Sequence, residues 1–320
     1  MGQMELTDGV LQASERLRPH VRETPVEAST VLARRCGAAS VHLKCENLQH
    51  TGSFKFRGAL NRLLLMSPEA RARGVVAAST GNHGMAVARA AQILDHPALV
   101  FHPTDAQETK LAGIRQLGAE TRAHGHDCVV CELAARDYVT EKELEYISPY
   151  NDLRVVAGQG TIAVELERQL EGVDAVFVSV GGGGLISGIG TWLRRWQPQA
   201  RIYGCSPVNS AVMLESLAAG KLLDLESLPT LSDGTAGGVE AGSVTFELCQ
   251  DVIDESVFVS EEQIADALRL VVSEHHMLIE GAAATAVAGY LKAGSALAGK
   301  RVAILLCGAN IASPTLKALL

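Results

Sequence analysis

One lysine in this 320-residue chain stands where an amine nucleophile would be useful. Lys55 lies in His50–Asn61 (HTGSFKFRGALN), where a strand over Val41–Lys44 leads through a polar loop into a helical run. Ser53 is a good N-cap, which places Lys55 in the first turn, at the positive end of the helix dipole. That potential favours the neutral amine, the form that makes Schiff bases. A lysine taken alone is nevertheless most often a solvated surface residue.

A second polar turn is Ser79–Gly84 (STGNHG), between a strand over Gly74–Ala78 and a helical run over Met85–Leu94. Small residues and side-chain donors at a helix N-terminus suit an anion such as a carboxylate. An ordinary N-capping turn explains the same residues equally well. His83 by itself is more often structural than catalytic.

A third motif is Ser179–Gly190 (SVGGGGLISGIG), which carries four consecutive glycines. Without Cβ atoms, successive backbone N–H groups can converge on a phosphate. A glycine run can also be a flexible linker, but the apolar strand before it and the helix after it favour the phosphate cradle. No Lys-Ser/Thr pair follows, so it is not a Walker A loop, and no acidic strand end follows at the spacing of a dinucleotide fingerprint.

The fourth motif, Leu305–Asn310 (LLCGAN), ends the last apolar run of the sequence. The thiol of Cys307, followed by glycine, could approach a cofactor ring, although a buried apolar cysteine explains it as well. The lone CxxC sequence Cys128–Cys131 lies inside a predicted helix over Asp127–Glu145. It has no second ligand pair, so we do not expect a metal or redox site there.

The elements that must hold these motifs alternate between short apolar strands and longer helical patterns. Further predicted strands are Ala98–His102, Ala119–Arg122, Asp174–Ser179, Arg201–Cys205, Ser256–Val259 and Arg301–Leu306, and the clearest helical runs are Ala106–Leu117, Ile162–Leu170, Glu261–Glu274 and Ala282–Lys292. This alternation predicts an α/β fold with mostly parallel sheets and helices on both faces. Ligands bind at the carboxyl ends of such strands, where all four motifs fall. Leu222–Ser243 lacks periodicity and is predicted to be a functional or mobile loop.

Composition excludes several classes of protein. Hydrophobic residues make up 47% of the chain and aromatic residues 4%, which suits a large, closely packed α/β core. The net charge is −8 and no basic tract is present, so no nucleic acid partner is expected. Seven irregularly spaced cysteines are typical of a reduced, cytoplasmic protein. No leader sequence or long apolar run predicts a membrane partner.

The four motifs, in this order, resemble the serine/threonine dehydratase and serine racemase family of fold type II pyridoxal 5′-phosphate (PLP) enzymes. The resemblance runs from about Thr24 to Ala312. Its most specific element is Lys44–Ala59, which reads K-x-E-N-x-Q-x-T-G-S-F-K-x-R-G-A. It implies a two-domain fold, with residues 1–65 and 153–320 forming a large cofactor-binding domain and residues 66–152 a small domain that binds the substrate carboxylate.

The resemblance also assigns roles to single residues. Lys55 would hold PLP covalently and, once freed, remove the substrate α-proton as general base. The implied cofactor contacts are Phe54 and Glu280 near the ring, Asn82 at its 3′-oxygen, Cys307 at its nitrogen, and the N–H groups of Gly181, Gly182, Gly183 and Gly184 at the phosphate. The residues implied for the substrate carboxylate are Ser79, Thr80 and His83.

The implied activity is that of a PLP-dependent ammonia-lyase, or dehydratase. Its substrate would be a small 3-hydroxy L-amino acid (threonine, serine, 3-hydroxyaspartate or phenylserine), converted to a 2-keto acid and ammonia. A thiol at Cys307 is a weak donor with an intrinsic pKa of about 8.5. It should leave the ring nitrogen largely unprotonated, which favours prompt loss of a β-leaving group.

Two alternative interpretations of the chain stay open. The chain could be an amino-acid (serine) racemase with side dehydratase activity, but racemases of the family resemble Ser-Ser-Gly-Asn-His-Gly, and Thr80 replaces the second serine. Its methyl group would crowd the α-carbon. The chain could also be a non-catalytic PLP-binding protein, against which Lys55, Asn82 and the glycine run argue. Family members that catalyse β-replacement have Asn-Thr-Gly where this chain has Asn-His-Gly, so β-replacement is not the expected activity.

The remaining expectations concern metals, partners and regulation. Relatives with a divalent-cation site use acidic side chains at positions that here resemble Ser206 and Val212, so no metal site is expected. The resemblance implies a homodimer. Because no regulatory domain follows in this sequence, a catabolic role without isoleucine feedback is expected.

Overall fold

The computed structural model describes residues 3–106, 108–126 and 128–320. Strands in these residues form a six-stranded sheet in the order β1-β2-β10-β7-β8-β9 and a four-stranded sheet in the order β5-β4-β3-β6. The strands are β1 (Val26–Ala28), β2 (Ser40–Lys44), β3 (Val75–Ala78), β4 (Ala98–His102), β5 (Glu120–Ala123), β6 (Glu145–Tyr146), β7 (Ala175–Ser179), β8 (Arg201–Pro207), β9 (Glu255–Val259) and β10 (Arg301–Leu305).

The helices alternate with these strands along the chain. They are α1 (Gln3–Leu17), α2 (Thr30–Cys36), α3 (Lys55–Leu64), α4 (Pro68–Arg73), α5 (Asn82–Leu94), α6 (Glu108–Gln116), α7 (Cys128–Lys142), α8 (Leu153–Gln169), α9 (Gly184–Trp196), α10 (Val212–Ala219), α11 (Val244–Val252), α12 (Glu261–His275), α13 (Gly281–Ala293) and α14 (Ser313–Leu319), with 3-10 turns η1 (Glu46–Leu48), η2 (His50–Gly52), η3 (Asp233–Thr235) and η4 (Gly294–Leu297). None of the helices within the described ranges is long and apolar enough to cross a membrane.

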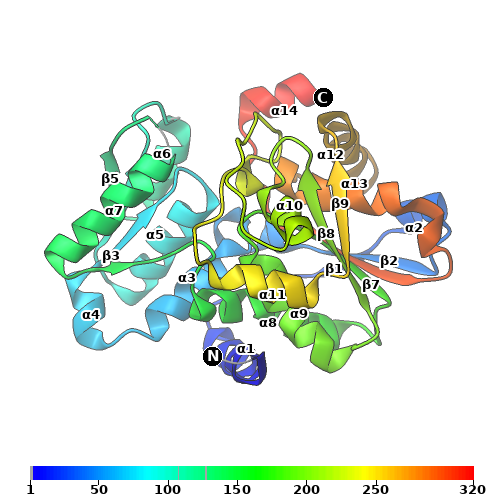
Figure 1. The fold of residues 1–320 in the computed structure, drawn as a ribbon, viewed down its shortest axis with the longest axis horizontal. Helices are drawn as coiled ribbons and strands as arrows, with labels where there is room; N and C mark the ends of the chain where they lie inside the picture. The colour runs from blue at the N-terminus through cyan, green and yellow to red at the C-terminus, as the bar shows by residue number, and fades with distance from the viewer. Residues whose placement is uncertain (1–2, 107, 127) are drawn as a thin grey trace.

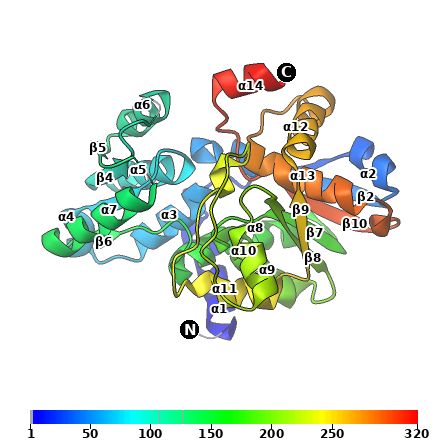
Figure 2. The ribbon, with the colours of Figure 1, turned by 45° about the horizontal axis from the view of Figure 1, so that its top comes forward.

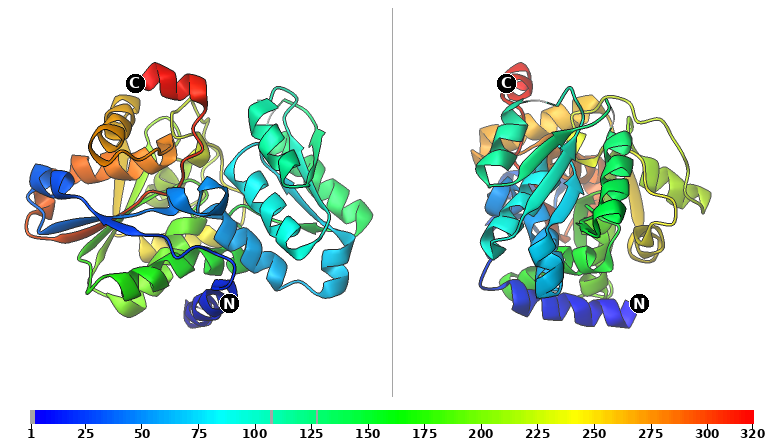
Figure 3. Two further views of the ribbon diagram at one scale, coloured as in Figure 1. Left: turned by 180° about the vertical axis from the view of Figure 1, so that it is seen from behind. Right: turned by 90° about the vertical axis from the view of Figure 1, so that its left-hand side faces the viewer.

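Both sheets are parallel except where β1 joins the larger sheet antiparallel to β2. Figure 1 shows the smaller sheet with α4 to α7 on the left and the larger sheet on the right. Seen from behind, α2, α12 and α13 lie on one face of the larger sheet and α1, α8 and α9 on the other (Figure 3). The predicted class, a mostly parallel α/β fold with helices on both faces, is confirmed.

Apolar strands and small residues at helix contacts hold the larger sheet together. β7 and β10 read AVFVS and RVAIL and are buried along almost their whole length, as central strands covered on both faces must be. A Cβ atom on Gly188 would lie 2.3 Å from the carbonyl oxygen of Val156, so α8 and α9 touch through their backbones. This contact fixes the helix that follows the glycine run.

The predicted strands are found within two residues of their expected ends, but some elements differ. β1 and β6 were not predicted, because strands of three and two residues leave too little periodicity. α8 begins at Leu153 rather than Ile162, since Asp152 caps it there through a side-chain bond to the Arg154 amide. The helix predicted over Asp127–Glu145 is found as α7, while Asp127 itself lies outside the described residues.

The segment predicted as a loop, Leu222–Ser243, has no regular structure beyond the turn η3. Figure 2 shows it, drawn in yellow-green, passing between the two sheets before α11 begins. The segment therefore lies where the carboxyl ends of strands from both sheets meet.

Candidate active site

The lysine singled out in the sequence opens a helix, but the helix begins one residue later than predicted. Ser53 is not the N-cap: its backbone is extended and pairs with Gly308 in an isolated antiparallel bridge, which leaves Phe54 at the cap position without a side-chain capping bond. The Oγ atom of Ser53 is buried and finds no hydrogen-bond partner among the residues that the structure describes. Lys55 is the first residue of α3.

The Lys55 amine is held among apolar and neutral groups. Its Nζ atom donates to the carbonyl oxygen of Pro149 at 3.0 Å and lies 5.2 Å from the ring centroid of Phe54. Burial lowers the pKa of Lys55 to about 8, although nearby Cys307 and Glu280 act in the opposite direction. Burial, which was not considered from the sequence, therefore makes the neutral amine accessible at moderate pH.

The glycine run is closely packed, so it is not a flexible linker. A Cβ atom on Gly182 would lie 2.3 Å from the ring of Tyr150, and one on Gly183 would lie 2.5 Å from Sγ of Cys249. Gly183 has φ 84° and precedes the first turn of α9, whose N–H groups lack helical partners. The result is a rigid turn of backbone donors at the positive end of a helix, which suits a phosphate.

A single pocket brings together every residue predicted to bind the cofactor. Its lining also includes Tyr150, Ser179, Leu185, Gly234, Thr235 and Ala282. The predicted residues in its lining are Phe54, Lys55, Asn82, Gly181, Gly182, Gly183, Gly184, Glu280 and Cys307. They come from the segments that follow β2, β7 and β10, which are neighbours in the larger sheet, from the residue before α13, and from the start of α5 beside the smaller sheet.

A second cavity adjoins this pocket and contains the predicted carboxylate loop. Ser79, Thr80 and His83 line it together with Lys55 and Asn82. The far wall is built from side chains of α6 and α7 and from the loop before α11. These lining residues are Lys110, Glu132, Asp233, Ala236, Gly237 and Gly238. An amino acid in this cavity would therefore lie between the Lys55 amine and the start of α5.

His83 cannot use its imidazole N–H for an anion. The Nε2 atom lies 2.7 Å from the carbonyl oxygen of Ile147, so it carries the hydrogen and donates it there. Burial, reinforced by Lys55, lowers the pKa of His83 to about 3, which keeps the ring neutral and leaves Nδ1 without a hydrogen. The backbone N–H of His83, in the first turn of α5, is the group that remains for a carboxylate.

Glu280 and Asn82 form a hydrogen-bonded pair at the boundary of the two cavities. Asn82 Nδ2 lies 2.8 and 3.0 Å from the two carboxylate oxygens of Glu280. Glu280 is only 3% exposed, and burial raises its pKa to about 7. Asn310 completes the group and was not singled out from the sequence, although it ends the LLCGAN motif. Tyr150, in contact with the glycine run, was not assigned a role of its own from the sequence either.

The thiol of Cys307 stays protonated. Burial, together with the neighbouring carboxylate of Glu280, raises its pKa well above the ordinary value of a thiol. The carbonyl oxygen of Cys307 accepts a hydrogen bond of 3.1 Å from the Phe54 amide, which ties the end of β10 to the residue before Lys55. A neutral sulfur therefore faces the pocket.

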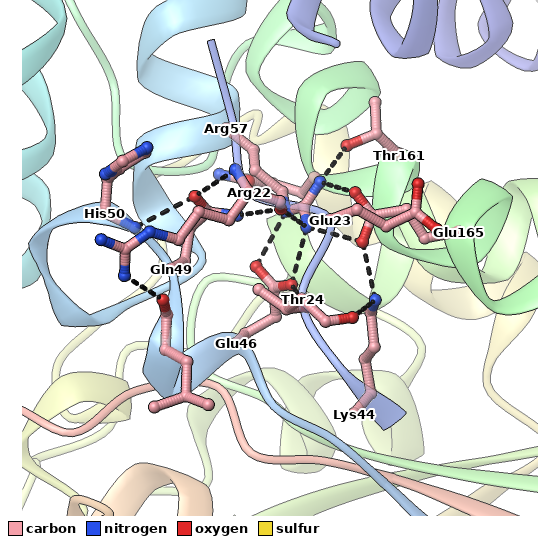
Figure 4. Close-up of polar contacts among 12 residues, drawn as sticks. Arg22, Glu23, Thr24, Lys44, Glu46, Gln49, His50, Arg57, Thr161 and Glu165 are labelled. Carbon is pink, nitrogen blue, oxygen red and sulfur yellow. Dashed lines mark hydrogen bonds and ion pairs between the residues drawn. The ribbon is translucent and has the colours of Figure 1, made fainter. Parts of the chain in front are cut away.

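A buried ion network anchors the helix that carries Lys55 (Figure 4). Arg57, which is wholly buried, donates to both oxygens of Glu46 at 2.8 Å and to Glu165 on α8 at 2.6 and 2.9 Å. Lys44, at the end of β2, donates to Glu165 at 2.6 Å. Two cations and two carboxylates thus balance, and they join β2, α3 and α8 around the first turn of α3.

The two positions expected to have lost a metal ligand make other contacts. Ser206 donates to the carbonyl oxygen of Val180 at 2.8 Å, and Val212 is buried as the first residue of α10. In the CxxC sequence, Cys131 is buried and its thiol donates to the carbonyl oxygen of His124, while the side chain of Cys128 lies outside the described part of the structure.

Comparison with known proteins agrees with the geometry of the site. A family model described as pyridoxal-phosphate dependent enzyme matches residues 17–308. An L-threonine ammonia-lyase of Thermotoga maritima is 40% identical over 95% of this chain and 75% of the relative, and a serine racemase of Schizosaccharomyces pombe is 34% identical over 95% and 94%. The solved structure of the processed form of threonine deaminase isoform 2 from Solanum lycopersicum has a TM-score of 0.93 at 32% identity, covering 100% of this chain and 88% of that one.

Proposed function

Because this chain belongs to the pyridoxal-phosphate dependent enzyme family, we propose that it is an ammonia-lyase that uses Lys55 to remove water from a small 3-hydroxy L-amino acid. Threonine is the leading substrate, since relatives named for threonine match almost the whole chain, and serine has the same reacting atoms. The observation that carries the proposal is the buried Lys55 amine, which lines both the pocket of the glycine run and the cavity of the carboxylate loop.

Three features of the pocket fit PLP. The turn Gly181–Gly184 offers backbone donors for a phosphate and is too crowded by Tyr150 and Cys249 for side chains. Lys55 offers an amine with a pKa of about 8 for the aldehyde carbon. Asn82 and Glu280 offer polar groups beside the position expected for the PLP ring, and Cys307 offers a neutral thiol there.

Different residues of the chain bind the substrate and transfer the proton. When bound, PLP supplies an electron-withdrawing ring that makes the α-proton of an attached amino acid acidic. The N–H groups at the start of α5, with Ser79 and Thr80, hold the substrate carboxylate and so place the α-carbon near Lys55. The Lys55 amine takes the α-proton, which is possible because burial keeps part of it unprotonated near neutral pH. The β-hydroxyl then leaves as water, and the proton that Lys55 took up balances this loss. Hydrolysis of the released enamine yields a 2-keto acid and ammonia.

The domain division and the assembly belong to the same proposal. We infer that residues 66–152 act as a small domain, since the strands of the four-stranded sheet all fall within it. A homodimer is inferred from the family resemblance, and a location in the cytoplasm from the seven irregularly spaced cysteines of the sequence.

The test is production of 2-keto acid from a panel of 3-hydroxy L-amino acids by the purified holoenzyme, compared by kcat/KM. Wild type should turn over threonine or serine, and activity should persist after EDTA treatment. The Lys55→Ala variant should lose all turnover and the visible absorption band of the lysine-bound cofactor. Retention of either by the variant would contradict the proposal.

Racemisation is the second candidate, favoured by the serine racemase relative and by the position of Thr80 in the same cavity as Lys55. The Thr80 hydroxyl would have to exchange a proton on the face of the α-carbon opposite Lys55. Chiral analysis of serine recovered after incubation with the enzyme separates the two activities, because D-serine forms only if a second group delivers a proton.

A further inference from the structure

Asn310, in the loop that follows β10, makes three hydrogen bonds at the boundary between the two cavities. Its Nδ2 atom donates to Asn82 Oδ1 at 2.6 Å and to the carbonyl oxygen of Thr51 at 2.8 Å. Its backbone N–H donates to Glu280 Oε2 at 3.0 Å. It therefore touches the start of α5, the loop before Lys55 and the residue before α13.

The amide of Asn310 is itself fixed in one orientation. A Cβ atom on Gly52 would lie 2.9 Å from Asn310 Oδ1, and Gly52 has φ 73°, so the loop before Lys55 packs directly against this amide. If the Asn310 amide rotated by 180°, its oxygen would face the carbonyl oxygen of Thr51, and two acceptors would meet. Asn310 therefore presents a donor to Asn82 at all times.

Asn82 has two possible amide orientations that occupy the same space. In the observed one, Oδ1 faces the Asn310 donor and Nδ2 faces Glu280. In the rotated one, the donor of Asn82 would meet the donor of Asn310 and its oxygen would meet the Glu280 carboxylate. Both contacts would be repulsive while Glu280 is ionised, but a protonated Glu280 could donate to the rotated oxygen. Only Asn310 distinguishes the two orientations whatever the charge of Glu280.

From this geometry we propose that Asn310 is a positioning residue that fixes the amide orientation of Asn82, and thereby the direction in which Asn82 presents its donor to the cofactor. The proposal rests on the proposed function, because it takes Asn82 to be a cofactor contact.

The consequence depends on pH through Glu280, whose pKa lies at about 7. The groups that act on Glu280 are Lys55 on α3, Cys307 after β10, and the Lys110–Asp233 pair of α6 and η3. Asn310→Ala leaves all of them in place. Above the pKa, ionised Glu280 still selects the observed orientation of Asn82 without Asn310. Below it, Glu280 loses that preference, and the rotated amide becomes populated.

The experiment measures the dissociation constant of PLP by equilibrating holoenzymes with decreasing free PLP at about pH 6 and about pH 8.5, on either side of the Glu280 pKa. Asn310→Ala should bind PLP about tenfold more weakly than wild type at the lower pH and within about twofold of wild type at the higher pH. Asn310→Asp presents an acceptor to Asn82 and should weaken binding at both. Asn209→Ala is the matched control, since Asn209 donates to a carbonyl (Pro229) and lines neither cavity.

A double variant adds a readout that a purely structural role would not produce. Once Asn82→Ala has removed the amide, adding Asn310→Ala should change PLP binding less than about twofold at either pH. The inference would be overturned if Asn310→Ala alone lost the same PLP affinity at both pH values. It would also be overturned if Asn310→Ala lost as much PLP affinity in the Asn82→Ala background as in wild type. If wild type deaminates threonine but the PLP affinity of Asn310→Ala does not fall at low pH, only this inference is overturned. If that affinity falls at low pH but wild type has no turnover, only the proposed function is overturned.

Discussion

Burial sets the protonation of the side chains around the pocket, and it does so in opposite directions. It lowers the pKa of Lys55 to about 8 and of His83 to about 3, and it raises that of Glu280 to about 7. Desolvation disfavours whichever form is charged, so cations lose protons and the carboxylate gains one. Near neutral pH the site therefore contains a partly free amine, a neutral imidazole and a carboxyl group that is ionised only in part.

His83 should make the protein sensitive to acid. Its pKa is about 3 when folded and about 6.5 when unfolded, so the unfolded chain binds the extra proton between these values. The contribution of the neutral ring to the free energy of unfolding is therefore fully present above about pH 6.5. It falls as the pH drops, and about 3 kcal/mol of it is lost at about pH 4. Urea unfolding across this range should show a shallower fall for His83→Gln than for wild type.

The control for His83 is the exposed His124, whose replacement by Gln measures the effect of the substitution itself at a surface position. Parallel curves for wild type and His83→Gln would mean that the buried ring accepts a proton as readily as a solvated one. That result would also reopen a role for the imidazole in binding the substrate carboxylate.

Gly182 tests the phosphate cradle. Alanine there would place a Cβ atom 2.3 Å from the Tyr150 ring, whose hydroxyl oxygen accepts a hydrogen bond from the Glu240 amide, so the ring cannot move freely. The turn must shift instead, and PLP affinity should fall at least about tenfold, measured as the cofactor dissociation constant. Gly113→Ala in α6 is the control: among the described residues its Cβ would meet only Met85 Sδ, at 3.5 Å, and affinity should not change.

At the scale of elements, α3 depends on the ion network around Arg57. Replacing Arg57 with Met removes one of two buried cations and leaves Glu46 without its guanidinium partner. An uncompensated buried carboxylate costs about 3–5 kcal/mol of unfolding free energy, to be measured by denaturant titration of the holoenzyme. The network should also be needed for cofactor retention, because it holds the first turn of α3.

The matched control is Arg201→Met, which breaks the surface pair with Glu255. Those side chains are 57% and 46% exposed, so the loss should stay below about 1 kcal/mol. Similar losses for both variants would show that the buried charges are solvated by the relaxed structure and that the network does not anchor α3.

The sequence predicts an element well when the residues that determine it are close together in the chain, and poorly when distant partners determine it. The apolar runs of β7 and β10 predict their strands within one residue, and the helices α12 and α13 are found as their periodicity indicates. Ser53 shows the limit, because its preference for an N-cap is overridden by pairing with Gly308, 255 positions along the chain. Tyr150 and Asn310 could not be assigned either, since each acts through partners that are distant in sequence.

At the scale of the whole molecule, polar contacts tie the loop before α11 to the helices across the substrate cavity. Glu240 accepts hydrogen bonds of 2.8 Å from Arg136 on α7 and from Asn151, and Asp233 pairs with Lys110 on α6 at 3.0 Å. Cβ atoms on Gly237, Gly238 and Gly242 would meet no described residue within 4 Å, so little packing restrains these three positions of the loop. The contacts with Arg136, Asn151 and Lys110 are therefore the ones expected to restrain this part of the loop.

Glu240→Ala should loosen the loop without unfolding the protein. It removes the contacts to Arg136 and Asn151, each worth on the order of 1 kcal/mol at this partly exposed position, so amide hydrogen exchange in residues 233–243 should accelerate about tenfold while the melting temperature changes little. Because Asp233, Ala236 and Gly237 line the substrate cavity, the KM for threonine should rise more than kcat falls. Asp266→Ala, which breaks an exposed pair on α12, should alter neither quantity. Unchanged exchange in the Glu240→Ala loop would place the restraint elsewhere, on the Lys110–Asp233 pair, and Lys110→Gln would then have to produce the acceleration.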